Sequence, residues 1–404
     1  MIRAYAFRFY PNSKQSERLE ETLELCRVLY NAALEQRRYA RHLGQPISYH
    51  IQQNQLPELK GALKEFKQVY SQVLQNVLRR VDFAFKNFFD RCSRRKRGER
   101  IKAGYPRFKS SWRYNSFTYP QDGFKILPSG HIFLSKVGKL RVFMHRKIAG
   151  EIKTLTLKRD HVGDWFVVVT ARLADVAQIQ PKSALGVDIG LKNLVTLSSG
   201  DEVEAPKFFR ESELKLRRAQ KAFSHKFPGS NNRKKARLRL AKIHRKIGRQ
   251  RDDFLHKLSR NLVRKTDLLI FENLHISDMT KNRKLAKSIH DASWGTLIRY
   301  ASYKASSAGK KVEQIDPRGT TQRCSGCGRS VKKSLSDRVH RCPTCGLVFD
   351  RDLNAALNIL DVGRGTPELK PAETRPPPPP PDSRGEHRAE EAGSPRLVVG
   401  GCHE

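Results

Sequence analysis

Four cysteines in the last quarter of the chain are arranged as two Cys-x-x-Cys pairs. Cys324 and Cys327 form the first pair, and Cys342 and Cys345 form the second after 14 intervening residues. Four thiolates at this spacing can bind one Zn²⁺ in a tetrahedral cage. A redox motif needs only one such pair, so the doubled motif favours a structural zinc site.

Three acidic residues stand where a metal-dependent reaction would need them. Asp188 and Glu272 each end an apolar segment, and Asp352 lies at the start of a predicted helix after the cysteines. Each alone could be a turn, a strand end or a helix cap, and Asp350 is a second acid at the helix start. Their joint occurrence favours one site, because carboxylates at the edge of an apolar sheet are costly unless a cation offsets them.

The chemistry predicted for these acids is phosphodiester hydrolysis. Carboxylate oxygens are ligands that Mg²⁺ prefers, so the predicted cofactors are two Mg²⁺ ions, with Mn²⁺ as the alternative, beside the structural Zn²⁺. Two such ions can activate a water and stabilise the leaving oxygen when a phosphodiester is cleaved.

The charge of the chain indicates what it binds. Lysines and arginines number 79 against 40 aspartates and glutamates, a formal net charge of +39. Such an excess destabilises a compact protein unless a polyanion offsets it, and nucleic acid is the natural one. Residues 210–251 hold 16 lysines or arginines and only two glutamates, which predicts a helical arm that contacts phosphates.

The sequence favours an intracellular protein. It has no apolar run of the length that a membrane span needs, and its start alternates like a strand instead of a signal peptide. Most of its cysteines lie in the two pairs, which fits a reducing compartment better than a disulfide framework. We therefore predict a cytoplasmic, nucleoid-associated protein with no membrane partner.

The segments around the acids predict the frame that holds them. The predicted strands are 184–190, 194–198, 202–204, 268–272 and 311–315, and the predicted helices are 210–263 (broken at 227–232), 294–308 and 351–361. The acids come from the first strand, a later central strand and the final helix. This order matches an α/β nuclease domain of the RNase H-like type.

The N-terminal part predicts a β unit that contains inserted helices. A strand is predicted at 2–9, helices at 14–42, 57–70 and 71–93, and further strands at 116–119, 130–134, 139–144, 152–158 and 165–172. Short alternating strands of this kind are typical of a small antiparallel barrel or sandwich. Strand 2–9 could join it, and the helices would then be an insertion. The proline-rich tail, 362–404, is predicted to be disordered.

Several of these motifs together resemble the transposon-encoded OrfB/TnpB family, RNA-guided DNA endonucleases related to type V CRISPR effectors. The matching segments are 186–193, 271–274, 294–304, 320–328, 342–346 and 350–359, with weaker matches at 10–12, Asn31 and 104–109. The resemblance covers about residues 1–361 and is most specific in the C-terminal half. The proline-rich tail lies outside it.

The resemblance implies a domain organisation. Residues 1–10 and 104–180 would form a β-barrel wedge domain, and 11–103 a helical recognition domain inserted into it. Residues 181–319 and 349–361 would form a RuvC-like nuclease domain, interrupted by a zinc ribbon at 320–348.

The resemblance also implies an activity, partners and site residues. A guide RNA from the transposon end would pair with target double-stranded DNA beside a short target-adjacent motif, displacing one strand, in a prokaryotic host. The catalytic, Mg²⁺-binding acids would be Asp188, Glu272 and Asp352. Asp352 is preferred over Asp350 because the family's acid precedes x-Asn-Ala-Ala, which leaves Asp350 as a cap. The zinc ligands would be Cys324, Cys327, Cys342 and Cys345.

Other functions stay open on the sequence alone. One is an RNA-guided DNA-binding protein that does not cut, although the three acids argue against it. Another is an accessory transposition protein that binds DNA through the zinc ribbon. A strand-transfer transposase of RNase H fold is disfavoured by the zinc ribbon between the second and third acids.

Overall fold

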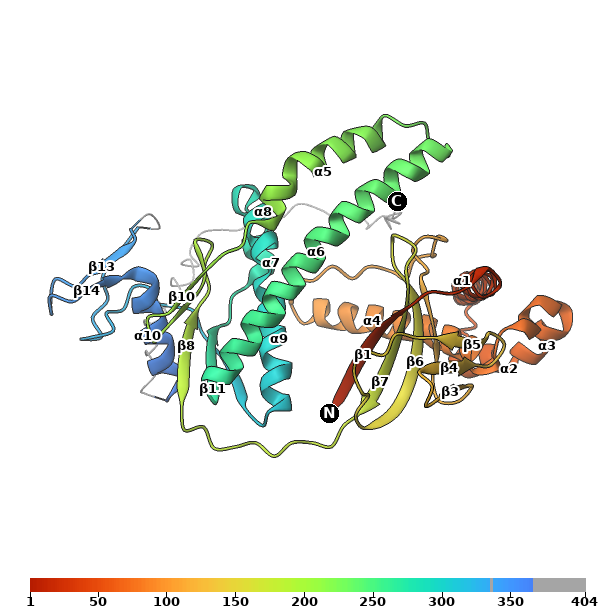
Figure 1. The fold of residues 1–404 in the computed structure, drawn as a ribbon, viewed down its shortest axis with the longest axis horizontal. Coiled ribbons are helices and arrows are strands. Elements are labelled where there is room, and N and C mark those ends of the chain that lie inside the picture. Colours follow the sequence, from red (N-terminus) through yellow and green to blue (C-terminus); the bar gives the residue numbers. More distant parts are fainter. Residues whose placement is uncertain (335–336, 366–404) are drawn as a thin grey trace, which may run out of the picture.

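The computed structural model describes residues 1–334 and 337–365, in two parts joined by an extended segment after residue 172 (Figure 1). The N-terminal part holds two antiparallel sheets and a block of helices. The C-terminal part holds a mixed sheet, a long helical hairpin and the cysteine unit. The tail predicted at 362–404 lies almost wholly outside the described residues, and its first two residues instead extend the last helix to Gly363.

The first strand joins strands that lie far along the chain. The larger N-terminal sheet has the order β1-β7-β6-β2, with β1 (Ile2–Phe9), β7 (Trp165–Arg172), β6 (Glu151–Arg159) and β2 (Ser116–Tyr119). The smaller sheet consists of β3 (Phe124–Ile126), β4 (His131–Leu134) and β5 (Gly138–Arg141). All pairings are antiparallel, and a single bridge from Phe9 to Val142 links the two sheets. The predicted pairing of strand 2–9 with this sheet is therefore confirmed.

The helical block lies between β1 and β2 in the chain, as predicted for an insertion. It consists of α1 (Ser13–His42), α2 (Tyr49–Asn54), α3 (Leu56–Ala62), the 3-10 helix η1 (Lys64–Gln68) and α4 (Ser71–Lys96). The single helix predicted at 57–70 is wrong, because Leu63 adopts an extended backbone, with φ −118° and ψ 94°, that ends α3. Helix α2 was not predicted.

The C-terminal sheet has the order β10-β9-β8-β11-β12. Its strands are β8 (Ala184–Asp188), β9 (Asn193–Leu197), β10 (Glu202–Glu204), β11 (Leu268–Glu272) and β12 (Lys311–Ile315). Strands β8, β11 and β12 run parallel, whereas β9 pairs antiparallel with both β8 and β10. Every residue of β11 is buried, which explains its unbroken apolar sequence.

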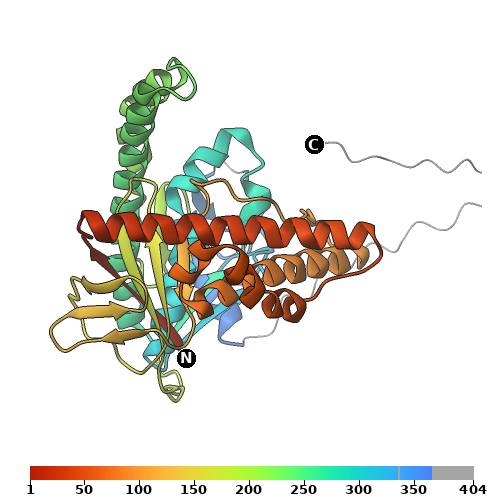
Figure 2. The same ribbon diagram turned by 90° about the vertical axis from the view of Figure 1, so that its right-hand side faces the viewer.

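Two helices form the predicted basic arm, and four more complete this part. They are α5 (Phe208–Ser224), α6 (Asn231–Lys265), α7 (Ile276–Met279), α8 (Arg283–Ala292), α9 (Trp294–Ser307) and α10 (Arg351–Gly363). The hairpin of α5 and α6 projects beyond the rest of the molecule (Figure 2). Its base is anchored by the buried Asp291 of α8, which accepts hydrogen bonds from the backbone of Phe209 at 3.2 Å and from Arg251 at 2.9 Å.

Helix α10 can cross β8 closely only because residue 186 is a glycine. A Cβ at Gly186 would lie 2.7 Å from the backbone nitrogen of Leu360 and would also clash with the carbonyl oxygen of Ala356. Both clashing atoms are backbone atoms, so a rotamer change cannot relieve them. Gly186 therefore sets the contact between the sheet and the helix that carries Asp352.

We expect Gly186→Ala to destabilise the protein by about 1–3 kcal/mol, because overpacking would push α10 away from β8. Urea unfolding would measure the change. Gly248→Ala is the control: this helical glycine has no atom near its missing Cβ, so alanine there should be neutral or slightly stabilising. Equal midpoints for Gly186→Ala and the wild type would contradict the close crossing.

Candidate active site and zinc centre

Two of the predicted acids lie side by side at one edge of the C-terminal sheet. Asp188 is the last residue of β8, and Glu272 is the last residue of β11. These strands are parallel neighbours, and the preceding residues, Val187 and Phe271, are register partners. Both carboxylates are therefore brought to the same carboxyl end of the sheet, and both are buried.

The third acid is delivered by α10. Asp350 caps this helix, because its side chain accepts a 2.7 Å hydrogen bond from the backbone N–H of Asp352 and a longer one from that of Leu353. The predicted cap role of Asp350 is confirmed. Asp352, the acid preferred from the sequence, lies in the first turn of α10 and is buried.

The electrostatics of Asp188 indicate that the three acids share one environment. Burial and, after it, the negative charges of Glu272 and Asp352 together raise the pKa of Asp188 to about 8, against the opposing effect of Arg351. Burial also raises the pKa of Glu272, while a hydrogen bond from Thr320 lowers it. A divalent cation would relieve this repulsion, and carboxylate oxygens are the ligands that a hard metal ion takes.

Two neighbouring groups hold the carboxylates in place. The buried hydroxyl of Thr320 donates a hydrogen bond to Oε1 of Glu272. The guanidinium of Arg351 donates to Oδ1 of Asp352 from Nη2 at 3.0 Å and from Nε at 3.1 Å. Arg338 lies further off, with its Nη1 3.8 Å from Oδ2 of Asp352. The charge of Asp352 is therefore partly neutralised by residues of its own helix and of the cysteine unit.

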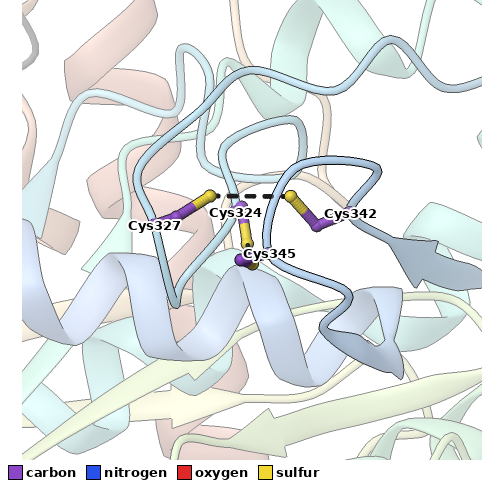
Figure 3. Close-up of side chains that lie close together, drawn as sticks. All are labelled: Cys324, Cys327, Cys342 and Cys345. Atoms are coloured by element: carbon purple, nitrogen blue, oxygen red, sulfur yellow. Dashed lines mark hydrogen bonds between the residues drawn. The ribbon is translucent and has the colours of Figure 1, made fainter.

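The four predicted zinc ligands converge on one point. Their Sγ atoms all lie within 4.8 Å of one another, with separations of 3.6 Å for Cys324–Cys345 and 3.5 Å for Cys327–Cys342 (Figure 3). Zn–S bonds of about 2.3 Å in a tetrahedron place sulfur atoms about 3.8 Å apart. The cluster therefore fits a structural Zn²⁺. Strand β13 (Val339–Arg341) lies between the two cysteine pairs, and β14 (Val348–Asp350) follows the second pair. The two strands pair as a short antiparallel hairpin.

Two asparagines of α10 connect the cysteine unit to the carboxylate site, and sequence reasoning missed both. Nδ2 of Asn354 donates to the carbonyl of Arg323 at 2.8 Å, and its Oδ1 accepts from the backbone N–H of Ser325 at 3.0 Å. Nδ2 of Asn358 donates to the carbonyls of Thr320 and Arg323, both at 2.7 Å. Thr320 is the residue that holds Glu272. The available signal was their four-residue spacing, which puts two amides on one face of an apolar helix.

We expect Asn358→Leu to destabilise the protein by about 1–3 kcal/mol, because it would leave buried carbonyls without a donor while roughly preserving volume. Thermal unfolding would measure this loss. Asn232→Leu, at an exposed position of α6, is the control and should change the melting temperature little. Wild-type stability in Asn358→Leu would argue against the amide network.

Three family models match this chain. A model described as "Probable transposase" of OrfB type matches residues 167–283, and a Cas12f1-like TNB domain matches residues 294–359. A model described as a helix-turn-helix domain of OrfB matches residues 1–44. In this structure that last segment consists of β1, a single long helix α1 and the turn after it.

Two relatives match this chain over most of their own length. A Streptomyces pristinaespiralis protein named "Putative RNA-guided DNA endonuclease" is 36% identical over 89% of each chain. The Escherichia coli K12 protein "Putative RNA-guided DNA endonuclease InsQ" is 30% identical over 90% of this chain and 92% of the relative. The structure titled "mini-RNA-guided endonuclease CRISPR-Cas_phi3" is similar with a TM-score of 0.50 and 10% identity, covering 90% of this chain and 92% of that one, which is a likeness of fold.

The sheet with its buried acids, the four-cysteine unit and these matches define a protein with a RuvC-like transposase region followed by a TNB-type zinc finger. The chain belongs to the OrfB/TnpB family. Among the residues that the structure describes, no helix combines the length and the apolar character that crossing a membrane would require.

Proposed function

We propose that this protein is an RNA-guided DNA endonuclease that cuts DNA at the edge of the C-terminal sheet. The observation that carries the proposal is that Asp188 and Glu272 end neighbouring parallel strands, and that the charges of Glu272 and Asp352 help to raise the pKa of the buried Asp188. Buried acids of this kind cost stability, so their presence points to a bound cation and to chemistry. The family membership supplies the substrate class, because the curated relatives are named as RNA-guided DNA endonucleases.

Mg²⁺ would be held by the three carboxylates, and when bound it would activate a water and stabilise the leaving oxygen of a phosphodiester. The residues of the chain prepare this site. Thr320 orients Glu272 through its hydroxyl, and Asp350 fixes the first turn that carries Asp352. Arg351 contacts Asp352 and offsets part of its charge. Both of the other acids raise the pKa of Asp188.

The other parts of the chain are assigned to handling RNA and DNA. We assign 1–10 and 104–180 to a wedge domain, 11–103 to a recognition domain, 181–319 with 349–361 to the nuclease, and 320–348 to the zinc ribbon. The antiparallel pairing of β1 with β7 supports the assignment of 1–10 and 104–180 to one domain, with the helices inserted between them. The guide RNA from the transposon end would pair with a DNA duplex beside a short motif and displace one of its strands.

Co-purification tests the proposal directly. The full chain would be purified with its bound nucleic acid, the RNA sequenced, and cleavage measured on a duplex that matches the RNA and on a scrambled one. We expect a discrete RNA and Mg²⁺-dependent cutting of the matched duplex alone. A preparation without a discrete RNA would contradict the RNA-guided function. RNA-directed DNA binding without cutting would favour the alternative of an RNA-guided DNA-binding protein that does not cut.

A further inference from the structure

A second candidate site lies outside the carboxylate centre, between the basic arm and the N-terminal part. Helix α6, the β6–β7 turn and the loop before β2 enclose an open pocket of about 850 Å³. The side chains that matter here are Trp112 from the loop, His161 from the turn, and Lys234, Arg237 and Leu238 from α6. None of the three buried acids lines this pocket.

The lining combines an exposed aromatic surface with free cations. Trp112 is 53% exposed and Leu238 is 38% exposed, although both are apolar side chains. The guanidinium of Arg113 lies 4.7 Å from the centre of the Trp112 ring. Within residues 1–334 and 337–365, Lys234 and Arg237 have no ion pair or hydrogen bond through their side chains. The pocket therefore offers a flat stacking surface beside two unneutralised positive charges.

A group of ion pairs holds the walls of the pocket together. Arg245 of α6 pairs with Asp160 at 3.1 Å and also with Asp164, both in the β6–β7 turn. Arg8 of β1 pairs with the same Asp164 at 2.7 Å. The acidic groups nearest the pocket are thus already neutralised, as Glu20 is by Arg159. The pocket is preformed, and its free charge is positive.

We propose that this pocket binds one unpaired nucleotide of an RNA loop, with the base stacked on Trp112 and its phosphates against Lys234 and Arg237. Proteins that recognise RNA commonly stack splayed-out bases on aromatic side chains, and lysine and arginine neutralise the flanking phosphates. A cavity of this size accommodates a nucleotide. The inference rests on the proposed RNA binding and adds to it a fixed anchoring point away from the cutting site.

Trp112→Ala tests the stacking. We expect the affinity of this variant for the co-purified RNA to decrease by a factor of about 5 to 150, the range found for single base–aromatic contacts. Chemical probing of the complex at single-nucleotide resolution should show one unpaired base that is protected in the wild type and reactive in this variant. Trp112→Phe keeps a ring and should restore most of the protection. Melting temperatures of both variants would exclude a folding defect.

A matched pair of double variants tests the phosphate contacts. Lys234→Gln/Arg237→Gln removes the two pocket cations, and Lys235→Gln/Arg239→Gln removes two exposed cations of the same helix that do not line the pocket. Loss of the phosphate contacts should weaken the salt dependence of binding in the pocket pair. Only the pocket pair should expose the nucleotide that Trp112 protects.

The outcomes separate this inference from the proposed function. Unchanged affinity and unchanged reactivity in Trp112→Ala, with RNA still bound and DNA still cut, would overturn the pocket alone. Equal probing patterns for the two double variants would also overturn the pocket proposal. Protection of a target DNA base in place of an RNA base would overturn it as well. A wild-type preparation without any discrete RNA would overturn both.

Discussion

Replacing Asp188 with asparagine is expected to abolish DNA cleavage while leaving the bound RNA in place. The amide side chain would keep the shape of the carboxylate and remove a charge that a divalent cation needs. Metal ions supply several kcal/mol of transition-state stabilisation, and each 1.36 kcal/mol is a factor of ten, so a loss of at least about 10³-fold is expected. The measurement is single-turnover cleavage of the matched duplex in Mg²⁺.

Asp201→Asn is the matched control, because Asp201 is exposed at the turn between β9 and β10. It should cut at the wild-type rate. The amount of RNA that co-purifies should be the same in all three proteins. Cutting by Asp188→Asn at the wild-type rate would refute the catalytic assignment and leave the RNA-guided binding function standing.

The same substitution is expected to stabilise the metal-free protein at neutral and alkaline pH. The pKa of Asp188 is raised from 3.8 to about 8 by burial and by its acidic neighbours. Between those two values the unfolded chain releases this proton while the native state retains it, so wild-type stability falls as pH rises from about 4 to about 8. Asparagine cannot ionise and escapes this loss.

Thermal unfolding in a chelator would measure this effect. The advantage of Asp188→Asn should grow between pH 4 and pH 8 and vanish near pH 4. Adding Mg²⁺ should raise the melting temperature of the wild type and affect the variant less, because the ion binds the native carboxylates. An equal response of both proteins to Mg²⁺ would remove Asp188 from the metal site.

The second large effect is expected from the zinc centre. Cys327→Ser should reduce bound zinc from one ion per chain to a small fraction, with a loss of stability on the order of several kcal/mol. The unit has little apolar packing of its own, since β13 and β14 have three residues each and Val339, Val348 and Phe349 are exposed. Zinc content by elemental analysis and thermal unfolding would measure both losses.

DNA cleavage should fall with the zinc, although the cysteines take no part in the reaction. Asn354 and Asn358 join α10 to the backbone of Arg323 and Thr320, so a disordered unit would release Glu272 and Asp352 together. Hydrogen exchange in the segment 320–350 should rise in Cys327→Ser. Cys92→Ser, at a half-buried thiol of α4, is the control and should keep zinc and activity. Full zinc occupancy in Cys327→Ser would disprove the four-thiolate cage.

Much of the frame around the site was accessible from the sequence. The strands that end in Asp188 and Glu272 were predicted within two residues, because buried parallel strands are continuous apolar runs bounded by turns. The zinc ligands were predicted from their spacing, which the metal itself dictates. Helix α8 was missed, however, and the break at Leu63 was not foreseen, because both depend on packing partners outside the local pattern.

The sequence by itself determined the chemistry that is available: four thiolates, three acids on apolar elements, and an arm dense in cations. These properties are local, because the type of ligand, the spacing of apolar residues and the charge each depend only on a short stretch of the sequence. The tertiary structure alone decided how they are connected. The raised pKa of Asp188, the amides that tie α10 to Thr320, and the pocket beside Trp112 all join residues distant in the chain. Burial and hydrogen-bond partners arise only when those segments pack together.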